Sequence, residues 1–480
     1  MSSLSRRQFL AAAATVAVAG TKSSAKVLGA NDRVRIAVAG LNGRGGAHVG
    51  EWSKMPDVEI TYLIDPDTRT YKKRLDQLKN KPRPKTIQDV RQALEDKDLD
   101  AISVATPNHW HSLMTIWGCQ AGKDVYVEKP ASHNIHEGKI AVATARKYNR
   151  IVQHGTQSRS SKKWMQLAEL AKAGTYGKLL VSRGLVYKDG GTTGQTTRGD
   201  LGFKPFKNPP RELDFNIWLG PAKTQPYHEN LVHYRWHWFW DFGNGDIGNQ
   251  GVHQMDIARW MIPGATLPKT VVSFGGRIGF KDQGQTARTQ VAVMDYGDTK
   301  LIFEVRGLPS KAYPHAGKSD NVLHFEAGTV AGGKFYPKGK GAAEPVAKVD
   351  AKVDGGESDH FANFIAAVRS RNVDRLHADI LQGHRSAALI HLANASYRLG
   401  KHVPFVDGKA LGLAGPAEDA VDRMEQHLSE EAKLTLADWP LTVGKVLTVD
   451  AEKEMVVDDD AANKLLTAEY RKGFAVPEKV

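Results

Sequence analysis

The chain has 480 residues, of which 41% are hydrophobic and 25% charged. This globular composition excludes wholesale disorder, collagen and coiled coil, and the length predicts two units of ordinary domain size. Lysine and arginine number 66 against 53 acidic residues, so the net charge is +13, which on its own could suggest nucleic acid or an anionic surface as partner. Cys119 is the one cysteine, which excludes an intrachain disulfide and a CxxC-type zinc or redox site.

Residues 1–30 carry four basic residues and no acidic one. The run Ser-Arg-Arg-Gln-Phe-Leu at 5–10 precedes an apolar, alanine-rich stretch of about a dozen residues, too short for a bilayer span of roughly 20. This pattern resembles a twin-arginine (Tat) signal peptide, which implies the Tat export machinery as a partner and a periplasmic or otherwise exported protein. A basic tail with a chance arginine pair is the alternative. Later apolar stretches are too short to predict a stable membrane anchor.

From residue 33 to about 152, short apolar runs alternate with stretches of helical periodicity. Strands are predicted at 34–39, 58–64, 101–105, 125–127 and 151–153. Helices are predicted at 47–54, 68–79, 88–95, 110–121 and 135–148. Strand and helix in regular alternation predict an α/β unit with a doubly wound parallel sheet.

The character of the chain changes after about residue 177. Aromatic residues and Gly, Pro and Asn turns dominate 187–242, and β-rich runs follow at 270–280, 289–295, 300–306 and 322–327. Their spacing predicts an open antiparallel sheet. A loop or hairpin is expected at 331–356, helices at 360–370 and 378–399, and a helical, then acidic, tail from residue 416.

The first predicted strand runs into a glycine-rich turn, which consists of Gly40, Leu41, Asn42, Gly43, Arg44 and Gly45. The Rossmann fingerprint is G-x-G-x-x-G between a strand and a helix, and Asn42 replaces its second glycine. Asn tolerates positive φ better than most residues, so we expect the turn to survive. Asp65 ends the second strand, where an acid hydrogen-bonds the adenosine ribose and repels a 2′-phosphate, which favours NAD over NADP. A glycine-rich turn of another α/β fold is the alternative.

Two more strands end in polar segments, at the sheet edge where open α/β folds bind ligands. The segment 106–111 reads Thr-Pro-Asn-His-Trp-His, and 121–130 reads Ala-Gly-Lys-Asp-Val-Tyr-Val-Glu-Lys-Pro. With the glycine-rich turn, these motifs resemble the Gfo/Idh/MocA oxidoreductase family over about residues 33–400. The resemblance implies a Rossmann domain, then an α/β domain with an open, mostly antiparallel sheet. It also implies hydride transfer between a nicotinamide and a carbinol carbon, commonly of a sugar or cyclitol.

The resemblance also implies roles for single residues. Lys129 would lie beside nicotinamide and substrate, stabilise a developing alkoxide and relay a proton, and His253 would be the acid/base on the substrate hydroxyl. The family's acid four residues before this histidine is replaced by Asn249, which can orient a hydroxyl but holds no charge, so Asp246 or Asp256 might have to substitute. Asp256 is otherwise expected to orient His253 or to cap structure. The predicted cofactor-binding set is the glycine-rich turn, Asp65, Thr106, Pro107, Asn108, His111, Glu128, Lys129 and Gln157.

The tryptophans of 236–240 form the other candidate surface. Trp236, Trp238 and Trp240 would share one face of a strand and could stack on a sugar, with core packing as the alternative. The predicted substrate-binding set adds Arg159, Tyr187, His237 and His253. The histidines of this region fit no common zinc spacing, so no metal is predicted. Without a basic repeat or a nucleic-acid motif, we expect no nucleic-acid partner.

We therefore place a Tat signal at 1–30, a NAD-binding Rossmann domain at 31–155, a substrate and oligomerisation domain at 156–415 and an extension at 416–480. The open sheet face predicts a homo-oligomer. Three functions stay open at this point. They are an exported NAD-dependent sugar or cyclitol oxidoreductase, a NAD-dependent glycoside-cleaving enzyme that oxidises its sugar transiently, and a non-catalytic sugar- or nucleotide-binding protein.

Overall fold

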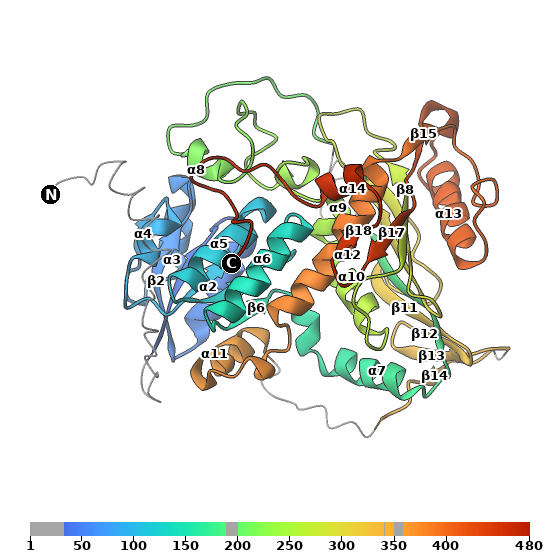
Figure 1. Cartoon of the computed structure of the whole chain (residues 1–480), viewed down its shortest axis with the longest axis horizontal. Helices are drawn as coiled ribbons and strands as arrows, with labels where there is room; N and C mark the ends of the chain where they lie inside the picture. The colour runs from blue at the N-terminus through green and yellow to red at the C-terminus, as the bar shows by residue number, and fades with distance from the viewer. Residues whose placement is uncertain (1–32, 189–199, 340, 350–358) are drawn as a thin grey trace.

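The computed structural model describes residues 33–188, 200–339, 341–349 and 359–480, which form two units packed side by side (Figure 1). The predicted Tat signal lies outside the described residues. The first unit contains a six-stranded sheet, and the second a twelve-stranded sheet. Among the described helices, none is long and apolar enough to cross a membrane.

The sheet of the first unit is parallel throughout, with the strand order β3-β2-β1-β4-β5-β6. Its strands are β1 (Val34–Ala39), β2 (Val58–Ile64), β3 (Lys85–Ile87), β4 (Ala101–Val104), β5 (Asp124–Val127) and β6 (Val152–His154). The order reverses between β1 and β4, and this is the point at which a doubly wound sheet opens a crevice for ligands.

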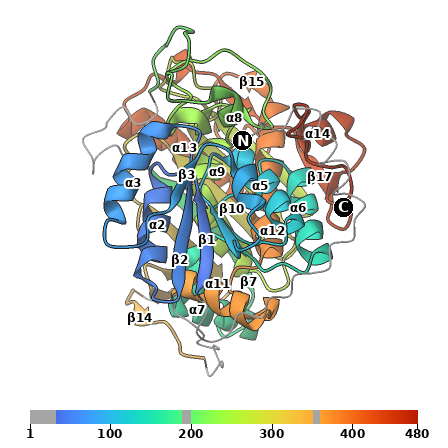
Figure 2. The same ribbon diagram turned by 90° about the vertical axis from the view of Figure 1, so that its left-hand side faces the viewer.

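Helices cover both sides of this sheet. They are α2 (Arg44–Lys54), α3 (Tyr71–Gln77), α4 (Val90–Leu94), α5 (Asn108–Gln120) and α6 (Ile135–Lys147). Figure 2 shows α2 and α3 on one side of β1 and β2, and α5 and α6 on the other. Each strand and helix predicted here is present. The short edge strand β3 was not predicted, because its three residues are mostly exposed and carry no apolar pattern.

The sheet of the second unit is mostly antiparallel, with β7 and β10 as its parallel neighbours. Its strands are β7 (Leu179–Tyr187), β8 (Thr270–Gly276), β9 (Thr289–Asp295), β10 (Lys300–Arg306), β11 (Ser319–Phe325), β12 (Gly328–Ala331), β13 (Lys334–Pro337), β14 (Glu344–Pro345), β15 (Lys401–Val403), β16 (Leu441–Val443), β17 (Leu447–Asp450) and β18 (Met455–Val456). The predicted strands and the predicted hairpin are confirmed. The sequence did not predict β7, whose apolar run is interrupted by Ser182, Arg183 and Gly184.

Alternate residues of β10 face opposite sides of this sheet, as the two-residue period of a strand requires. Leu301, Phe303 and Val305 share a core with α10 (Gly251–Trp260) and α12 (Ile380–Arg398). Ile302 faces the other side, in a core with α13 (Pro416–Gln426). Figure 1 shows α13 on the side of the sheet opposite α10 and α12. The chain thus covers part of the face that we expected to be open, and a homo-oligomer through this face stays a prediction.

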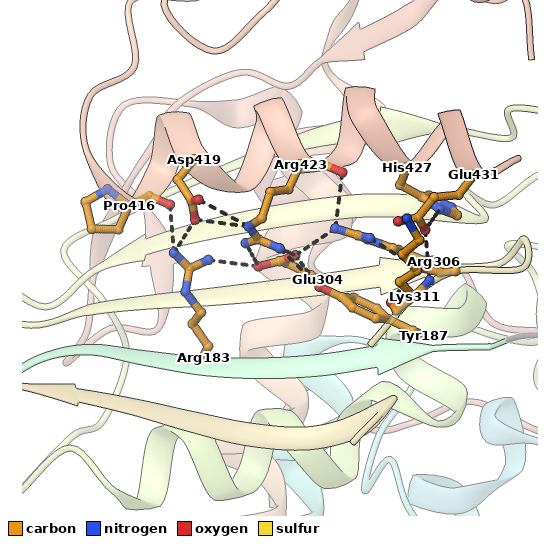
Figure 3. A network of polar contacts seen from close by, with 11 residues as sticks. Arg183, Tyr187, Glu304, Arg306, Lys311, Pro416, Asp419, Arg423, His427 and Glu431 are labelled. Atoms are coloured by element: carbon orange, nitrogen blue, oxygen red, sulfur yellow. Dashed lines mark hydrogen bonds and ion pairs between the residues drawn. The ribbon is translucent and has the colours of Figure 1, made fainter. Parts of the chain in front are cut away.

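Polar contacts hold α13 on the sheet (Figure 3). The buried Glu304 carboxylate of β10 accepts hydrogen bonds from Arg423 of α13 at 2.5 and 2.8 Å and from Arg183 of β7 at 2.8 Å. Asp419 of α13 accepts from Arg183 at 2.7 Å. One carboxylate thus joins the two strands to a helix of the C-terminal extension.

The extension differs from the predicted helical and acidic tail. After α13 the chain returns to the sheet, where β16 and β17 both pair with β8. It then reaches the first unit, where Phe474 packs edge-on against Trp110 of α5 at 5.7 Å. The sequence did not reveal these strands, because three or four residues are too short for a recognisable period.

Candidate functional site

A cavity of about 790 Å³ lies where the carboxyl ends of β1, β2, β4 and β5 meet the second unit. Most of the predicted site residues line it, namely Gly40, Asn42, Gly43, Arg44, Asp65, Thr106, Pro107, Asn108, His111, Glu128, Lys129, Gln157, Tyr187, Trp236, Trp238, Asn249 and His253. Outside its wall lie Leu41, Gly45, Arg159, His237 and Trp240. The cavity therefore unites the Rossmann motifs with the segment around His253, about 200 residues further along the chain.

The glycine-rich turn leaves no room for side chains at its two ends. A Cβ on Gly40, whose φ is +81°, would lie 2.6 Å from the Ala105 backbone, and a Cβ on Gly45 would lie 1.7 Å from the Gly40 oxygen. Between them, the positive φ falls on Gly43, at 39°, and not on Asn42. Our expectation that Asn42 would need its tolerance of positive φ was therefore wrong, because the next residue makes the turn.

Asp65 stands at the end of β2 and lines the cavity. Its two carboxylate oxygens accept the backbone N–H groups of Leu41 at 2.8 Å and Asp67 at 2.9 Å, so Leu41 contributes through its backbone. Burial raises the pKa of Asp65, while these two hydrogen bonds oppose the rise. The neighbouring Asp67 holds Arg69 through two hydrogen bonds of 2.8 and 2.5 Å, so this guanidinium is already paired.

Glu128 connects the glycine-rich turn to β5. One of its carboxylate oxygens contacts Arg44 at 2.7 Å, His48 at 3.1 Å and Gln157 at 3.2 Å. Burial alone would raise the pKa of Glu128, but the hydrogen bond from His48 and the charge of Arg44 hold it well below the usual range. The sequence reasoning missed His48, which lies one turn after Arg44 on α2 and forms part of no motif.

His111 closes the edge of the sheet rather than reaching into the cavity with a free nitrogen. Its Nδ1 lies 2.6 Å from the Pro130 oxygen, and its Nε2 lies 2.9 Å from the Thr106 oxygen. Both ring nitrogens thus face backbone carbonyls and join the ends of β4 and β5. The peptide bond between Lys129 and Pro130 in this segment is cis.

Lys129 projects from the end of β5 toward the second unit, where its Nζ donates to the backbone oxygen of Asn249. Burial lowers the pKa of Lys129 to about 8; the charge of Glu128 opposes this shift, and those of Lys188 and Arg44 add to it. The contact with residue 249 uses its carbonyl group. It is therefore available in this chain although the acid expected at that position is an asparagine.

His253 lies on α10, one turn after Asn249, and also lines the cavity. Burial lowers its pKa to about 4, and the charge of Lys129 lowers it further, so the imidazole is neutral at neutral pH and can accept a proton. Asp256 does not orient this ring through any described hydrogen bond. Its buried carboxylate instead accepts from Arg159 at 2.8 Å and from the Ser386 hydroxyl at 2.6 Å.

Four members of the predicted substrate-binding set have other contacts. Arg159 is buried against Asp256, and the His237 Nδ1 lies 2.6 Å from the Tyr234 oxygen. Tyr187 borders the cavity, but its hydroxyl donates to Glu304 at 2.7 Å beneath α13 (Figure 3). Trp240 lies under the Arg398 guanidinium, 4.9 Å from its ring centre, and lines a separate cavity. This geometry does not fit the predicted contacts of these side chains with substrate.

The tryptophan segment is not a strand. Residues Arg235–Trp238 form the 3-10 helix η4, so alternate positions do not share one face. Trp236 and Trp238 still line the cavity, whereas Trp240 lies beyond the helix and outside it. The prediction of a shared three-ring face was wrong, because it rested on the two-residue period of a strand.

Sequence reasoning also missed three cations in the cavity wall, Lys188, Arg288 and Lys318. They come from segments at least 30 residues apart and belong to no motif, so nothing in the sequence placed them together. Among the residues that the structure describes, no group of three His, Cys, Asp or Glu side chains is arranged to hold a metal.

The described residues fit a nicotinamide dinucleotide. The turn at Gly40 and Gly45 brings the backbone close to the start of α2, where a helix N-terminus favours phosphate. Thr106 Oγ1 and Asn108 Oδ1 are buried at the end of β4 without a hydrogen-bond partner among the described residues, and both residues line the cavity. A ligand that supplies polar atoms there would satisfy them.

Comparison with known proteins identifies the family. Residues 34–156 match the family model described as an oxidoreductase family with a NAD-binding Rossmann fold, and 199–430 match the model of its C-terminal alpha/beta domain. The chain belongs to the Gfo/Idh/MocA oxidoreductase family. This confirms the resemblance carried by the motifs, and it establishes the first unit as a NAD-binding Rossmann domain.

Individual relatives are more distant. A glycosyl hydrolase family 109 protein of Shewanella baltica is 26% identical over 155 residues, or 31% of this chain and 34% of the relative. An alpha-N-acetylgalactosaminidase of Shewanella oneidensis is 24% identical over 153 residues, or 31% and 33%. The chain thus spans about a third of the length of these curated relatives.

Among solved structures, the WlbA dehydrogenase from Bordetella pertussis, in complex with NADH and UDP-GlcNAcA, superposes with a TM-score of 0.56 at 17% identity. The match covers 76% of this chain and 97% of that one. It supports the two-domain fold, with the mostly antiparallel second sheet that the sequence predicted.

Proposed function

We propose that this member of the family transfers hydride between a nicotinamide and the CH–OH carbon of a sugar, sugar derivative or cyclitol. The observation that carries the proposal is that Lys129 and His253 line the same cavity as the glycine-rich turn and Asp65. Acid/base groups and a dinucleotide cradle thus share one enclosed space. NAD bound there would supply the hydride acceptor for oxidation of the carbinol carbon.

The two side chains have complementary roles in this proposal. Neutral His253, with its pKa of about 4, accepts the proton of the substrate hydroxyl. The Lys129 ammonium, held by the Asn249 carbonyl, stabilises the negative charge that develops on the same oxygen. Because the pKa of Lys129 is about 8, this ammonium can also give up a proton near neutral pH.

We propose NAD rather than NADP as the cofactor. Asp65 places a carboxylate at the end of β2, where it repels a 2′-phosphate. Arg69, the nearby cation that could offset this repulsion, is already paired with Asp67.

Native mass analysis of the purified protein, with and without added NAD(H), tests the proposal. It should show one dinucleotide per chain, and a panel of sugars and cyclitols should then change the nicotinamide absorbance. Failure to bind added dinucleotide would refute the proposal.

A glycoside-cleaving activity is the second candidate, favoured by the match to family 109 glycosyl hydrolases. In that case the same site oxidises the sugar, the aglycone leaves by elimination, and the cofactor returns to its starting state. Release of an aglycone without accumulated NADH supports this candidate, whereas net oxidation of a free sugar argues against it. For a non-catalytic binding protein, Lys129→Ala would leave the function of the protein unchanged.

We also propose export by the Tat pathway, with a periplasmic or otherwise exported location. The support is the arginine pair and apolar stretch of residues 5–19. Replacing Arg6 and Arg7 with lysines should retain the protein in the cytoplasm. Unchanged export of that variant would contradict the proposal.

A further inference from the structure

The two ends of the cavity differ in charge. Five cations line it, which are Arg44, Lys129, Lys188, Arg288 and Lys318. The carboxylates among its described lining residues are Asp65 and Glu128, and both lie at the Rossmann side, where backbone N–H groups, Arg44 and His48 engage them. The side formed by the second unit therefore presents cations without a carboxylate among the described residues of its surface.

Directly behind that surface, one carboxylate serves two of these cations. Asp246 is fully buried; Lys188 donates to its Oδ1, and the Arg288 Nε lies 3.5 Å from its Oδ2. Burial would raise the pKa of Asp246, but the charges of Lys188 and Arg288 lower it, so the group is ionised. The cluster of Lys188, Asp246 and Arg288 thus carries one positive charge in excess.

The excess charge is held in a low-dielectric position. Arg288 is 1% exposed, and its guanidinium lies 5.1 Å from the Trp238 ring centre and 4.7 Å from that of Phe280. Its Nη2 donates to the Gly307 oxygen at 2.9 Å, whereas Nε and Nη1 have no hydrogen-bond partner among the described residues. A buried cation with unmet donors is costly, and an anion in the adjoining cavity would lower that cost.

We infer that the substrate carries an anionic group, a carboxylate or a phosphate, which Lys188 contacts on the cavity side. Arg288 acts from behind by sharing Asp246, so that Lys188 keeps an uncompensated charge, and Lys318 adds a further cation to the same wall. The inference rests on the proposed function and narrows its substrate class to acidic sugars, that is, sugar acids or sugar phosphates.

The position of Lys188 fits this role. Its charge lowers the pKa of Lys129, so the two ammonium groups lie within electrostatic reach of each other. A substrate whose anionic group contacts Lys188 can therefore present a neighbouring carbinol to Lys129 and His253. Binding of the anion would also relieve the repulsion between the two lysines.

Calorimetric titration of the dinucleotide-loaded protein with matched ligands tests the inference. The probes are glucuronate and galacturonate, glucose 6-phosphate and galactose 6-phosphate, and the neutral parents glucose and galactose. We expect at least one acidic ligand to bind about tenfold or more tightly than its parent, because hydrogen bonds to a buried charge are strong. Preference for the sugar acid or for the phosphate identifies the anionic group.

Lys188→Gln and Arg288→Gln should each reduce that preference to less than about threefold. Lys172→Gln, which changes an exposed lysine of α7 (Lys162–Ala173), should leave it intact. The ratio of two affinities in the same variant does not depend on the folded fraction, and the Lys188 variant leaves the buried guanidinium in place.

Equal affinity for acidic and neutral ligands, or no binding of any acidic ligand by protein that holds its dinucleotide, would overturn the inference alone. A preference that survives both cavity variants would overturn it as well. Failure to bind dinucleotide would instead refute the proposed function.

Discussion

The two ends of the cavity are built on different electrostatic principles. At the Rossmann end, Asp65 accepts two backbone N–H groups, and Glu128 is matched by Arg44 and His48. At the other end, Asp246 alone stands behind Lys188 and Arg288. The first end has its charges matched within the protein and needs shape to hold a dinucleotide. The second retains excess positive charge, which selects a substrate and poises Lys129.

Removing the ammonium group between the two ends should have the largest effect. We expect Lys129→Ala to lower kcat by about a thousandfold, because it removes both charge stabilisation and a proton relay. Dinucleotide affinity, measured by nicotinamide fluorescence, should change by less than about threefold. The exposed Lys172→Ala on α7 is the control. Activity within tenfold of the unmodified protein would exclude Lys129 from the chemistry.

The shape of the Rossmann end should be the next most sensitive feature. A Cβ at Gly45 would lie 1.7 Å from the Gly40 oxygen, so Gly45→Ala must displace the turn. We expect dinucleotide affinity to fall by about a hundredfold, since roughly that factor follows from losing two or three good hydrogen bonds. Gly341→Ala, where a Cβ meets nothing within 4 Å, is the matched control. Equal affinities in the two variants would show that this turn does not hold the dinucleotide.

Cofactor choice should respond less strongly. Asp65→Asn removes the charge that repels a 2′-phosphate, so the preference for NADH over NADPH should fall by about tenfold. Both dinucleotides are titrated against the same variant, so that damage to the hydrogen bonds with Leu41 and Asp67 cancels in the ratio. An unchanged ratio would remove Asp65 as the determinant of cofactor choice.

The smallest expected effect is on the pH profile. We expect kcat/KM to fall below about pH 4, where His253 becomes protonated, and above about pH 8, where Lys129 loses its charge. Asn249→Asp would add a carboxylate at the residue whose carbonyl already holds Lys129, which favours the ammonium form. The alkaline limb should therefore move up by about one pH unit. A limb that stays in place would mean that another group causes it.

The sequence predicted the two ends of the cavity unequally. The glycine-rich turn, Asp65 and Lys129 were found because each stands at a fixed position relative to a strand, and local spacing is visible in a sequence. Lys188, Arg288 and Lys318 are brought together by the tertiary fold alone, from the end of β7, the start of β9 and the segment before β11. The strand assignment at Trp236–Trp240 failed because alternation of a few aromatic residues is equally compatible with a helical turn.

The fold shows the same division between local and long-range information. Most strands of the first unit were predicted because a buried parallel strand is a continuous apolar run. The pairing of β16 and β17 with β8 was not, because the strands are short and about 170 residues separate them from their partner. Arg423 and Asp419 likewise become recognisable as a link between α13 and the sheet only once Glu304 is placed beside them.

Deuterium transfer tests the central claim most directly. Protein loaded with oxidised NAD is mixed with acidic sugars that carry deuterium at their ring carbinol carbons, and the nicotinamide is analysed by mass spectrometry after one turnover. We predict one deuterium on the nicotinamide in the unmodified protein and none in Lys129→Ala. Conversion of the sugar without any label on the nicotinamide would contradict hydride transfer at this site.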